Sequence, residues 1–286
     1  GTASTDVDRT DTDEPDAPGR TRREYCYNIL VSGLDDDNGG SDTNILVRFD
    51  VPNKRIDLVS LPRDTLLHNE YRNNKLNFAY AKGGTELLME QIENLLGIPV
   101  DFYVTVNLKG FIALVDQIDG VDFDIPINMD YDDPYQDLHI HFTKGPRHLN
   151  GQEAMEVVRF RHNNDGTGYG TEDIGRIGTQ QAFLKAVAKQ LLQVGNVKNI
   201  PALVDIFYTY VKTDLTTGNL VWLGNEALNI GTENIHFATL PGDGSGYYNK
   251  QSVYVLDAQA TCDLVNEALN PYNEALTLED MDILVP

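Results

Sequence analysis

The stretch YCYNILVSGLDDDNGGSDTNILVRFDVPNKRIDLVSLP, residues 25–62, decides the fold. Runs of β-branched and aromatic residues predict strands over 25–33, 42–50 and 55–62. The loop LDDDNGGS and the turn VPNK separate them. Neither connection is long enough for a crossover helix, so consecutive strands are expected to be antiparallel.

This connectivity brings polar side chains to one edge of the predicted sheet. Asp35 follows the first strand, Asp42 begins the second, and Arg63 and Asp64 follow the third. Because an antiparallel chain reverses at each connection, all four belong to the same end. The sequence therefore predicts two carboxylates, Asp35 and Asp42, beside Arg63.

Helices and strands alternate over the rest of the chain, which indicates an α/β layered architecture. The clearest helix follows Thr85, the expected N-cap, and ends before Gly97. Asn150 and Asp257 are expected to cap two others. Further helices are predicted over 108–120, 179–194, 200–211 and 218–230, and strands over 98–107, 121–127 and 233–242. Residues 129–151 are expected to form an irregular excursion that is compatible with a hairpin.

The composition limits the classes of partner. The formal net charge is −22, from 22 Lys plus Arg against 44 Asp plus Glu. Such a field repels phosphate and excludes a general nucleic-acid surface, although a local basic pocket remains compatible with it.

Cys26 and Cys262 do not have metal-ligand spacing, and they are equally consistent with one disulfide or two buried thiols.

The first residues differ from the rest of the chain. Residues 1–22 are polar and contain prolines, which predicts a disordered linker, and 23–286 is expected to form a single domain. The sequence has no apolar run long enough to span a bilayer and no signal-peptide pattern. A linker at this position leads us to expect that an N-terminal segment has been removed.

Three arginines stand out in the segment VVRFRHNNDGTGYGTEDIGRIGTQQ, residues 157–181. Arg159 and Arg161 would point the same way on an extended segment. Arg176 shares a helix face with Gln180 if the helix includes both. With Arg63 and Lys75, they supply enough positive charge to hold a pyrophosphate, and Asp35 and Asp42 could then hold Mg²⁺. A structural alternative is equally open, because Asp165, Glu172 and Asp173 lie near enough in sequence to pair with the arginines.

Other patterns carry weaker signals. GTGYG at 166–170 and GDGSG at 242–246 lack the Lys and Ser/Thr of a Walker A motif and are expected to be flexible loops. His139 and His141 share one face of a predicted strand, but the sequence offers no third metal ligand, so a metal pair is disfavoured. The apolar stripe at 183, 184, 187 and 191 is expected in the core.

Across nearly the whole chain beyond the linker, the sequence resembles the LytR–CpsA–Psr family of bacterial cell-envelope enzymes. The segments that carry the resemblance occur in the family's order: NILVSGLD, SDTNILVRFD, IDLVSLPRDT, KLNFAYAKGG, IENLLGIPVDFYVTVNLKGFIALVDQIDGVDFDIP, LNGQEAMEVVRFR, DIGRIGTQQAFLKAV and YVLDAQATCDLVNEALNPY.

The resemblance implies a three-layer α-β-α fold with a central mixed, largely antiparallel sheet. It implies an N-terminal membrane-spanning anchor, with the catalytic domain outside the cell membrane. The implied activity is transfer of a glycopolymer phosphate from a polyprenyl-pyrophosphate carrier to peptidoglycan, with the polyprenyl tail in an apolar cavity that the stripe Phe183, Leu184, Val187 and Leu191 would help to line.

The resemblance also assigns residues. Asp35 and Asp42 match the carboxylates that hold Mg²⁺. The pyrophosphate shell matches Arg63, Lys75, Arg159, Arg161, Arg176 and Gln180, and the residues expected to act in catalysis are Asp42, Arg63, Arg161 and Arg176.

Two positions depart from the family's pattern: Gly40 and Thr179 stand where arginines are usual. They motivate a rival prediction of a lipid-pyrophosphate-binding protein with weak or no turnover. A second rival is a lipid pyrophosphatase that uses water in place of a sugar hydroxyl.

Overall fold

The computed structural model describes residues 19–34, 39–171, 173–191 and 200–286. The chain forms two compact units, the first made of Gly1–Thr105 and Lys212–Pro286 and the second of Val106–Val211. The single domain that the sequence predicts over 23–286 stays a prediction.

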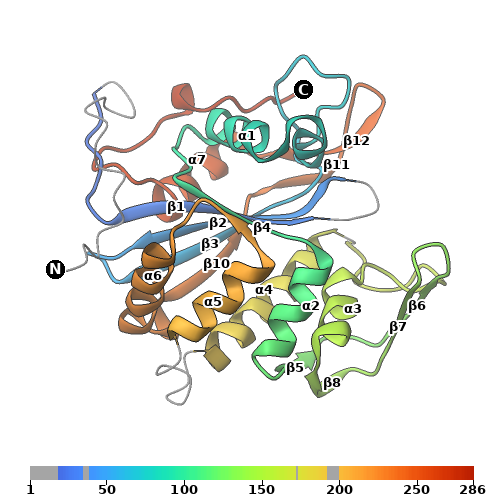
Figure 1. Cartoon of the computed structure of the whole chain (residues 1–286). Helices are drawn as coiled ribbons and strands as arrows, with labels where there is room; N and C mark the ends of the chain where they lie inside the picture. The colour runs from blue at the N-terminus through green and yellow to red at the C-terminus, as the bar shows by residue number, and fades with distance from the viewer. Residues whose placement is uncertain (1–18, 35–38, 172, 192–199) are drawn as a thin grey trace. The chain divides into compact units, whose positions relative to one another are not determined.

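The first unit is built on a six-stranded sheet with the order β10-β3-β2-β1-β4-β9 (Figure 1). As the short connections predict, β1 pairs with β2 and β2 with β3 in antiparallel register. The strand of this sheet that comes last in the sequence, β10, runs parallel to β3, which makes the sheet mixed. The strand bounds are Cys26–Leu34 for β1, Ser41–Asp50 for β2, Arg55–Leu61 for β3, Phe102–Val106 for β4, Lys212–Thr213 for β9 and Ile235–Thr239 for β10.

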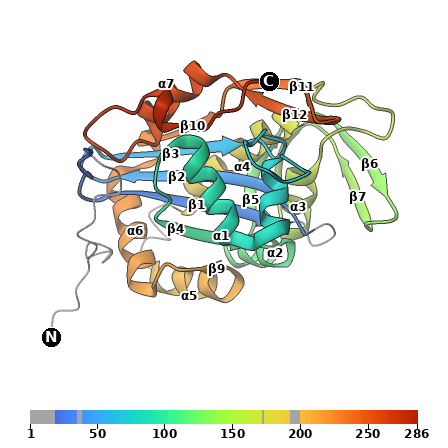
Figure 2. The same ribbon diagram turned by 90° about the horizontal axis from the view of Figure 1, so that it is seen from above.

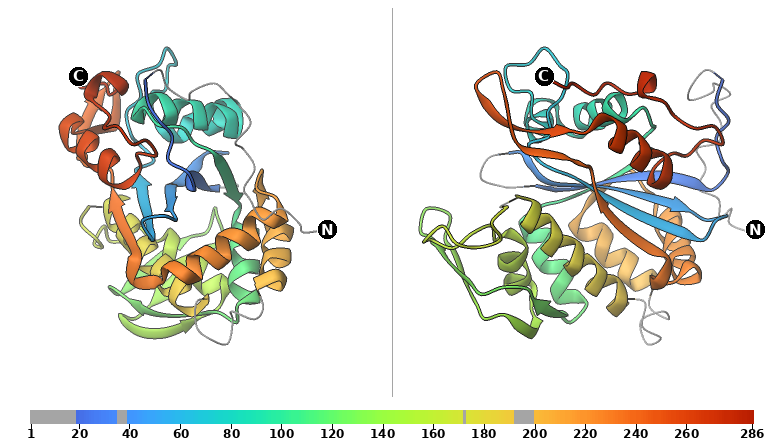
Figure 3. Two further views of the ribbon diagram at one scale, coloured as in Figure 1. Left: turned by 90° about the vertical axis from the view of Figure 1, so that its left-hand side faces the viewer. Right: turned by 180° about the vertical axis from the view of Figure 1, so that it is seen from behind.

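Helices cover both faces of this sheet, so the first unit has the three layers expected. Helices α1 (Leu76–Leu96) and α7 (Ala258–Ala268) lie on one face, and α6 (Thr217–Ile230) lies on the other (Figures 1 and 3). On the α1 side, Leu30 and Leu46 of the sheet and Leu88 of α1 are fully buried in one core. Asp257 caps α7 as predicted, through its bond from the Ala260 backbone N–H.

Element α1 consists of two helical stretches that meet at a kink, because Gly83 and Gly84 depart from helical geometry. The stretch after the kink matches the helix predicted after Thr85, and the stretch that begins at Leu76 was not predicted. A pair of glycines interrupts a helical pattern, so the sequence signals only the part that follows it. The end is as expected, with Gly97 in the left-handed region at φ 66°.

The segment GDGSG is not a loop, which makes that prediction wrong. It lies in β11 (Gly242–Tyr248), which pairs with β12 (Gln251–Leu256) in an antiparallel hairpin. Glycine weakens a strand because it has no side chain to pack. Here the partner strand supplies the pairing, with a register shift between Asp243 and Gly246.

Two arginines near the start of the described chain pair with distant carboxylates. Arg20 pairs with Asp280, near the C-terminus, at 2.6 Å, and Arg22 pairs with Asp101, just before β4, at 2.5 Å. Arg20 and Arg22 both belong to the range 1–22 that the sequence assigns to a linker.

Short 3-10 turns occur at Thr232–Asn234 and Leu278–Asp280.

Cys26 and Cys262 are both buried, and they are free thiols rather than a disulfide. Burial raises the pKa of the Cys26 thiol to about 11. This cysteine is therefore a neutral core residue at physiological pH.

The second unit consists of helices and two β-ribbons. The predicted hairpin is confirmed as β6–β7, which stands beyond α3 at the outer edge of the unit (Figure 2). Phe183 of α4 packs against Phe111 and Phe123 in the core of this unit. The bounds are α2 Leu108–Gln117, β5 Val121–Ile125, β6 Met129–Asp133, β7 Leu138–Phe142, β8 Gly145–Leu149, α3 Gly151–Arg159, α4 Asp173–Leu191 and α5 Ile200–Tyr210.

Asn150 caps α3 as predicted. Its side chain accepts from the Glu153 backbone N–H, and the Glu153 side chain accepts from the Asn150 backbone N–H, which completes a capping box.

None of the helices that the structure describes is both long and apolar enough to cross a membrane.

Candidate functional site

The predicted edge of the sheet is formed by Asp42 and Arg63. Asn44 of β2 pairs with Leu61 of β3, so the residues just outside this pair come from the same end of the two strands. The Arg63 guanidinium lies 2.7 Å from Asp42 Oδ1. The predicted clustering of these two residues is confirmed, whereas Asp35 lies outside the described residues.

Two further charges extend this pair. Asp64 Oδ1 lies 3.7 Å from Arg63 Nε and 3.3 Å from Lys75 Nζ. Asp42, Arg63, Asp64 and Lys75 therefore form a row of alternating charges, named here the sheet-edge cluster. Their side chains are 18–32% exposed. Ion pairs that water reaches contribute little to stability, so an anionic ligand can replace the carboxylate partners at small cost.

The backbone holds Lys75 beside this edge. The Asn77 N–H donates to the Arg63 carbonyl and the Leu76 N–H to the Thr65 carbonyl, each at 3.0 Å. These first N–H groups of α1 already have partners, so the helix N-terminus is not an open anion site. The positive groups available to a ligand here are the side chains of Arg63 and Lys75.

Sequence reasoning gave no role to three residues at this edge. Asp64 bridges the two cations. Ser41 Oγ and Asn77 Oδ1 are buried and lack a hydrogen-bond partner among the residues that the structure describes. Buried polar atoms are usually satisfied, so these two mark a place where a ligand or water would add a bond. In the sequence, the only signal for Ser41 was its position next to Asp42, and the only signal for Asn77 was its position two residues after Lys75.

In the second unit, Arg159 does not lie on an extended segment. It is the last residue of α3, and the chain leaves the helix at Phe160, with φ −58° and ψ 132°. The argument that a two-residue spacing points Arg159 and Arg161 the same way is therefore wrong, because α3 includes Arg159. Arg159 donates to Gln136 Oε1, in the β6–β7 turn, at 2.9 Å.

Arg176 and Gln180 lie in the first turns of α4, four residues apart, as predicted. Arg176 is 5% exposed and pairs with Asp173 at 2.5 Å, so the structural alternative holds for this arginine. Gln180 Nε2 donates to the Val158 carbonyl at 3.2 Å, which ties the start of α4 to the end of α3. Arg159, Arg161, Arg176 and Gln180 are named here the α3–α4 cluster.

Thr179, one of the two departures from the family's pattern, has a partner of its own. It is 4% exposed, and its Oγ1 lies 2.6 Å from the Tyr169 hydroxyl. The Tyr169 ring packs edge-on against Phe160. Burial raises the pKa of Tyr169, which keeps the phenol neutral. The sequence missed Tyr169 because it stands in the glycine-rich stretch GTGYG, which was expected to be only a loop.

Of the apolar stripe on α4, Phe183 lies in the core as predicted. Phe183 is 1% exposed and its ring lies 5.8 Å from that of Phe111 and 5.7 Å from that of Phe123. Leu184, Val187 and Leu191 are only partly buried. The prediction that this stripe contributes to a lipid cavity stays a prediction for those three residues.

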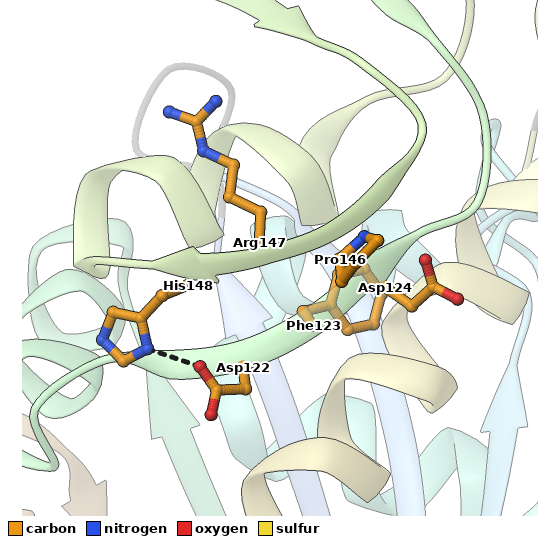
Figure 4. Close-up of a pocket in the computed structure, with 6 residues that line it drawn as sticks. All are labelled: Asp122, Phe123, Asp124, Pro146, Arg147 and His148. Carbon is orange, nitrogen blue, oxygen red and sulfur yellow. Dashed lines mark hydrogen bonds and ion pairs between the residues drawn. The ribbon is translucent and has the colours of Figure 1, made fainter.

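A hollow of about 400 Å³ lies on the β5–β8 ribbon (Figure 4). His148 Nδ1 lies 2.7 Å from Asp122 Oδ1 there, and Arg147 pairs with Glu153 at 2.5 Å. No residue of either cluster lines the hollow, and its own carboxylates disfavour an anionic ligand. The lining residues are Asp122, Phe123, Asp124, Pro146, Arg147 and His148.

Comparisons with known proteins identify relatives over most of the chain. The model of the LytR_cpsA_psr family matches residues 2–270. Two relatives are polyisoprenyl-teichoic acid–peptidoglycan teichoic acid transferases. TagV of Bacillus subtilis (strain 168) is 32% identical over 82% of this chain and 61% of its own length. TagU of Bacillus cereus is 32% identical over 84% of this chain and 76% of its own length. The chain thus spans less than two thirds of TagV.

Solved structures share the fold. The crystal structure of Bacillus subtilis TagV has a TM-score of 0.74 at 27% identity, and the match covers 92% of this chain and all of that one. TagT bound to LIIa-WTA has a TM-score of 0.68 at 22% identity, over 88% of this chain and 92% of that one. These likenesses agree with the mixed α/β architecture described above.

Proposed function

The chain belongs to the LytR_cpsA_psr family, and we propose that it transfers a glycopolymer phosphate from a polyprenyl-pyrophosphate carrier to peptidoglycan. The observation that carries the proposal is the sheet-edge cluster, in which Arg63 and Lys75 stand beside carboxylates that an anion can replace. Relatives at about 32% identity are transferases of teichoic acid to peptidoglycan.

The proposed reaction is a displacement at phosphorus. A peptidoglycan hydroxyl oxygen attacks the sugar-linked phosphorus of the diphosphate, the bond from that phosphorus to the bridging oxygen breaks, and polyprenyl phosphate leaves. The attacking hydroxyl loses its proton, for which Asp42 is the candidate acceptor. Negative charge builds on the leaving phosphate, and the guanidinium of Arg63 is placed to stabilise it.

The proposal includes Mg²⁺, and the residues at the sheet edge suit it. This ion takes oxygen ligands and is commonly held by one or two carboxylates together with substrate phosphates. Asp42 offers such a carboxylate, partly exposed, and the hydroxyl of its chain neighbour Ser41 is buried without a hydrogen-bond partner among the described residues. When bound, Mg²⁺ would neutralise diphosphate charge there. Asp35 is proposed as its second carboxylate.

The α3–α4 cluster is proposed to bind phosphate oxygens through Arg161, with Gln180 fixing the helix that carries Arg176. Arg176 is buried with Asp173, so its first role is to hold the start of α4 in place. Arg159 is proposed to hold the end of α3 against the β6–β7 turn through its hydrogen bond to Gln136. Family membership further supports a domain outside the cell membrane on an N-terminal anchor, and this placement is part of the proposal.

A second candidate function is a lipid-pyrophosphate-binding protein with slow turnover. Thr179, which stands where an arginine is usual, is buried against Tyr169 and supplies no cation. Electrostatic donors of this kind contribute on the order of 10²–10³ each to the rate. If the absence of these two arginines limits turnover, the double variant Gly40→Arg, Thr179→Arg would speed pyrophosphate cleavage more than it changes affinity for the donor. This requires that Tyr169 moves to admit the new side chain at position 179.

One assay separates these functions. The protein is incubated with Mg²⁺ and a polyprenyl-pyrophosphate-linked glycan, with and without peptidoglycan. Release of polyprenyl phosphate that requires peptidoglycan and yields a glycan–peptidoglycan phosphodiester supports the transferase. Equal release without peptidoglycan identifies a pyrophosphatase. Binding of the donor with no release in either mixture overturns the transferase in favour of the binding protein.

A further inference from the structure

The β6–β7 hairpin carries two histidines on its outward face. His139 and His141 are exposed, whereas Leu138, Ile140 and Phe142 between and beside them are buried in the core of the second unit. The alternation of a β-strand therefore fixes both imidazoles on the same side. Across the hairpin, Asp132 is paired with His139 and Asp130 with His141.

The structure supplies the third ligand that the sequence did not reveal. Asp132 Oδ1 lies 2.5 Å from His139 Nδ1 and 3.1 Å from His141 Nε2. Among the described residues, these three form the group whose ligand atoms all lie within 4.8 Å of one another. Two histidine nitrogens and one carboxylate oxygen thus converge from adjacent strands.

The opposite nitrogen of each imidazole faces a further carboxylate. His141 Nδ1 lies 2.8 Å from Asp130 Oδ1, and His139 Nε2 lies 3.4 Å from Asp137 Oδ1. Metal-binding histidines usually donate their second ring N–H to a carboxylate, which fixes the tautomer and the ring orientation. A proton on each outer nitrogen leaves the inner nitrogen, the one facing Asp132, with a lone pair for an ion.

We propose that Asp132, His139 and His141 bind one divalent transition-metal ion, with zinc as the expected occupant. Imidazole with carboxylate suits zinc, and three protein ligands plus water complete its tetrahedral shell. Zinc holds neighbouring ligand atoms about 3.3 Å apart, so these exposed side chains need to open only slightly from their present hydrogen bonds. Magnesium, which takes oxygen ligands, does not suit this set.

An ion here would brace a wider segment of the second unit. It would join β6 to β7 through side chains, in addition to their backbone pairing. The backbone N–H groups of Asp130 and Asp132 donate to the side chains of Asn163 and Asn164, at 2.7 Å and 2.6 Å. Those asparagines follow Arg161, so the ion stabilises the hairpin against which this segment lies. The metal site stands whether or not the proposed transferase activity does.

The test uses the full chain, stripped of metal with a chelator and titrated with ZnCl₂ in a calorimeter. One ion per chain and a zinc-dependent rise in Tm are expected, since a ligand that binds only the folded state stabilises it. His141→Ala and His139→Ala should each weaken zinc binding at least about tenfold. The heat of titration with MgCl₂ should be the same for the unchanged protein and for these two variants.

His148→Ala is the matched control. His148 also lies on an antiparallel ribbon opposite an aspartate, Asp122, with its Nδ1 2.7 Å from that carboxylate, but among the residues that the structure describes it does not belong to a group of three metal ligands. Zinc affinity should survive this change. An affinity unchanged in His139→Ala and His141→Ala, or equally reduced in His148→Ala, overturns the site. Circular dichroism of the metal-free variants establishes that each is folded.

Discussion

The sheet-edge cluster and the α3–α4 cluster carry similar residues but hold them differently. At the sheet edge, partly exposed ion pairs join Arg63 to Asp42 on the neighbouring segment and to Asp64, the next residue in the chain. In the α3–α4 cluster, Arg176 is buried and pairs with Asp173 within its own helix. An exposed pair can exchange its carboxylate for a ligand, whereas a buried local pair is expensive to break. The same residue type therefore makes exchangeable surface contacts in one unit and a buried structural contact in the other.

The largest effect is expected for Arg63→Ala. Loss of the guanidinium should slow single-turnover cleavage of a polyprenyl-pyrophosphate donor by about 10²–10³, because the charge it stabilises grows in the transition state. Arg55→Ala is the control, since Arg55 begins β3, the strand that Arg63 follows, and pairs with Asp57 and Glu267 instead. A rate for Arg63→Ala equal to that of the control would remove Arg63 from the chemistry.

The sheet edge could be predicted because strand connectivity alone sets it. The short connections between β1, β2 and β3 allow only antiparallel pairing, and this brings Asp42 to Arg63 whatever the side chains do. The pairing of Asp64 with both Arg63 and Lys75 was not predictable, because it depends on where α1 begins. That start was hidden by Gly83 and Gly84.

The α3–α4 cluster was less predictable because it depends on helix ends. Helix α3 includes Arg159, so this residue is not on an extended segment, and helix boundaries are the least certain part of any sequence pattern. The contact between Tyr169 and Thr179 joins a loop to a helix, and no periodicity signals such a pair. The same holds for Asp132, whose place beside His139 follows from the hairpin register.

Arg176→Ala should act on stability more than on chemistry. Removing the guanidinium leaves Asp173 without its buried partner, which we expect to lower the free energy of unfolding by about 3 kcal/mol. Urea denaturation followed by circular dichroism measures this. If stability is retained while donor affinity falls, Arg176 contacts the ligand directly and the contrast between the two clusters fails.

Arg161→Ala should show the opposite balance. A charge-assisted hydrogen bond to phosphate contributes about 1.5–3 kcal/mol, so donor affinity should fall roughly tenfold or more, with little loss of stability. Arg147→Ala is the control, because Arg147 is an exposed arginine of the same unit that pairs with Glu153. Calorimetric titration with a polyprenyl pyrophosphate gives both affinities. Equal affinities would exclude Arg161 from the binding shell.

The same titration tests whether Arg161 acts on the lipid molecule that Arg63 binds, which stays a prediction from the sequence. Residues that bind one ligand are expected to be non-additive, by at least about 0.5 kcal/mol. The Arg63→Ala, Arg161→Ala double variant completes the cycle. Additive losses would assign the two arginines to independent sites.

The smallest effect is expected for Thr179→Val, which removes the hydroxyl that meets Tyr169 at 2.6 Å and keeps the side-chain shape. The Tyr169 hydroxyl then loses a partner, and stability should fall by about 1 kcal/mol. Tyr169→Phe should cost a similar amount. The double variant should recover part of the loss, because replacing both partners by apolar groups of similar shape leaves neither unsatisfied. Donor affinity should stay constant in all three variants, since the pair is buried and local. A loss of affinity in Thr179→Val with unchanged stability would instead place this hydroxyl on the ligand, and position 179 would then contribute to binding even without the arginine that is usual in the family.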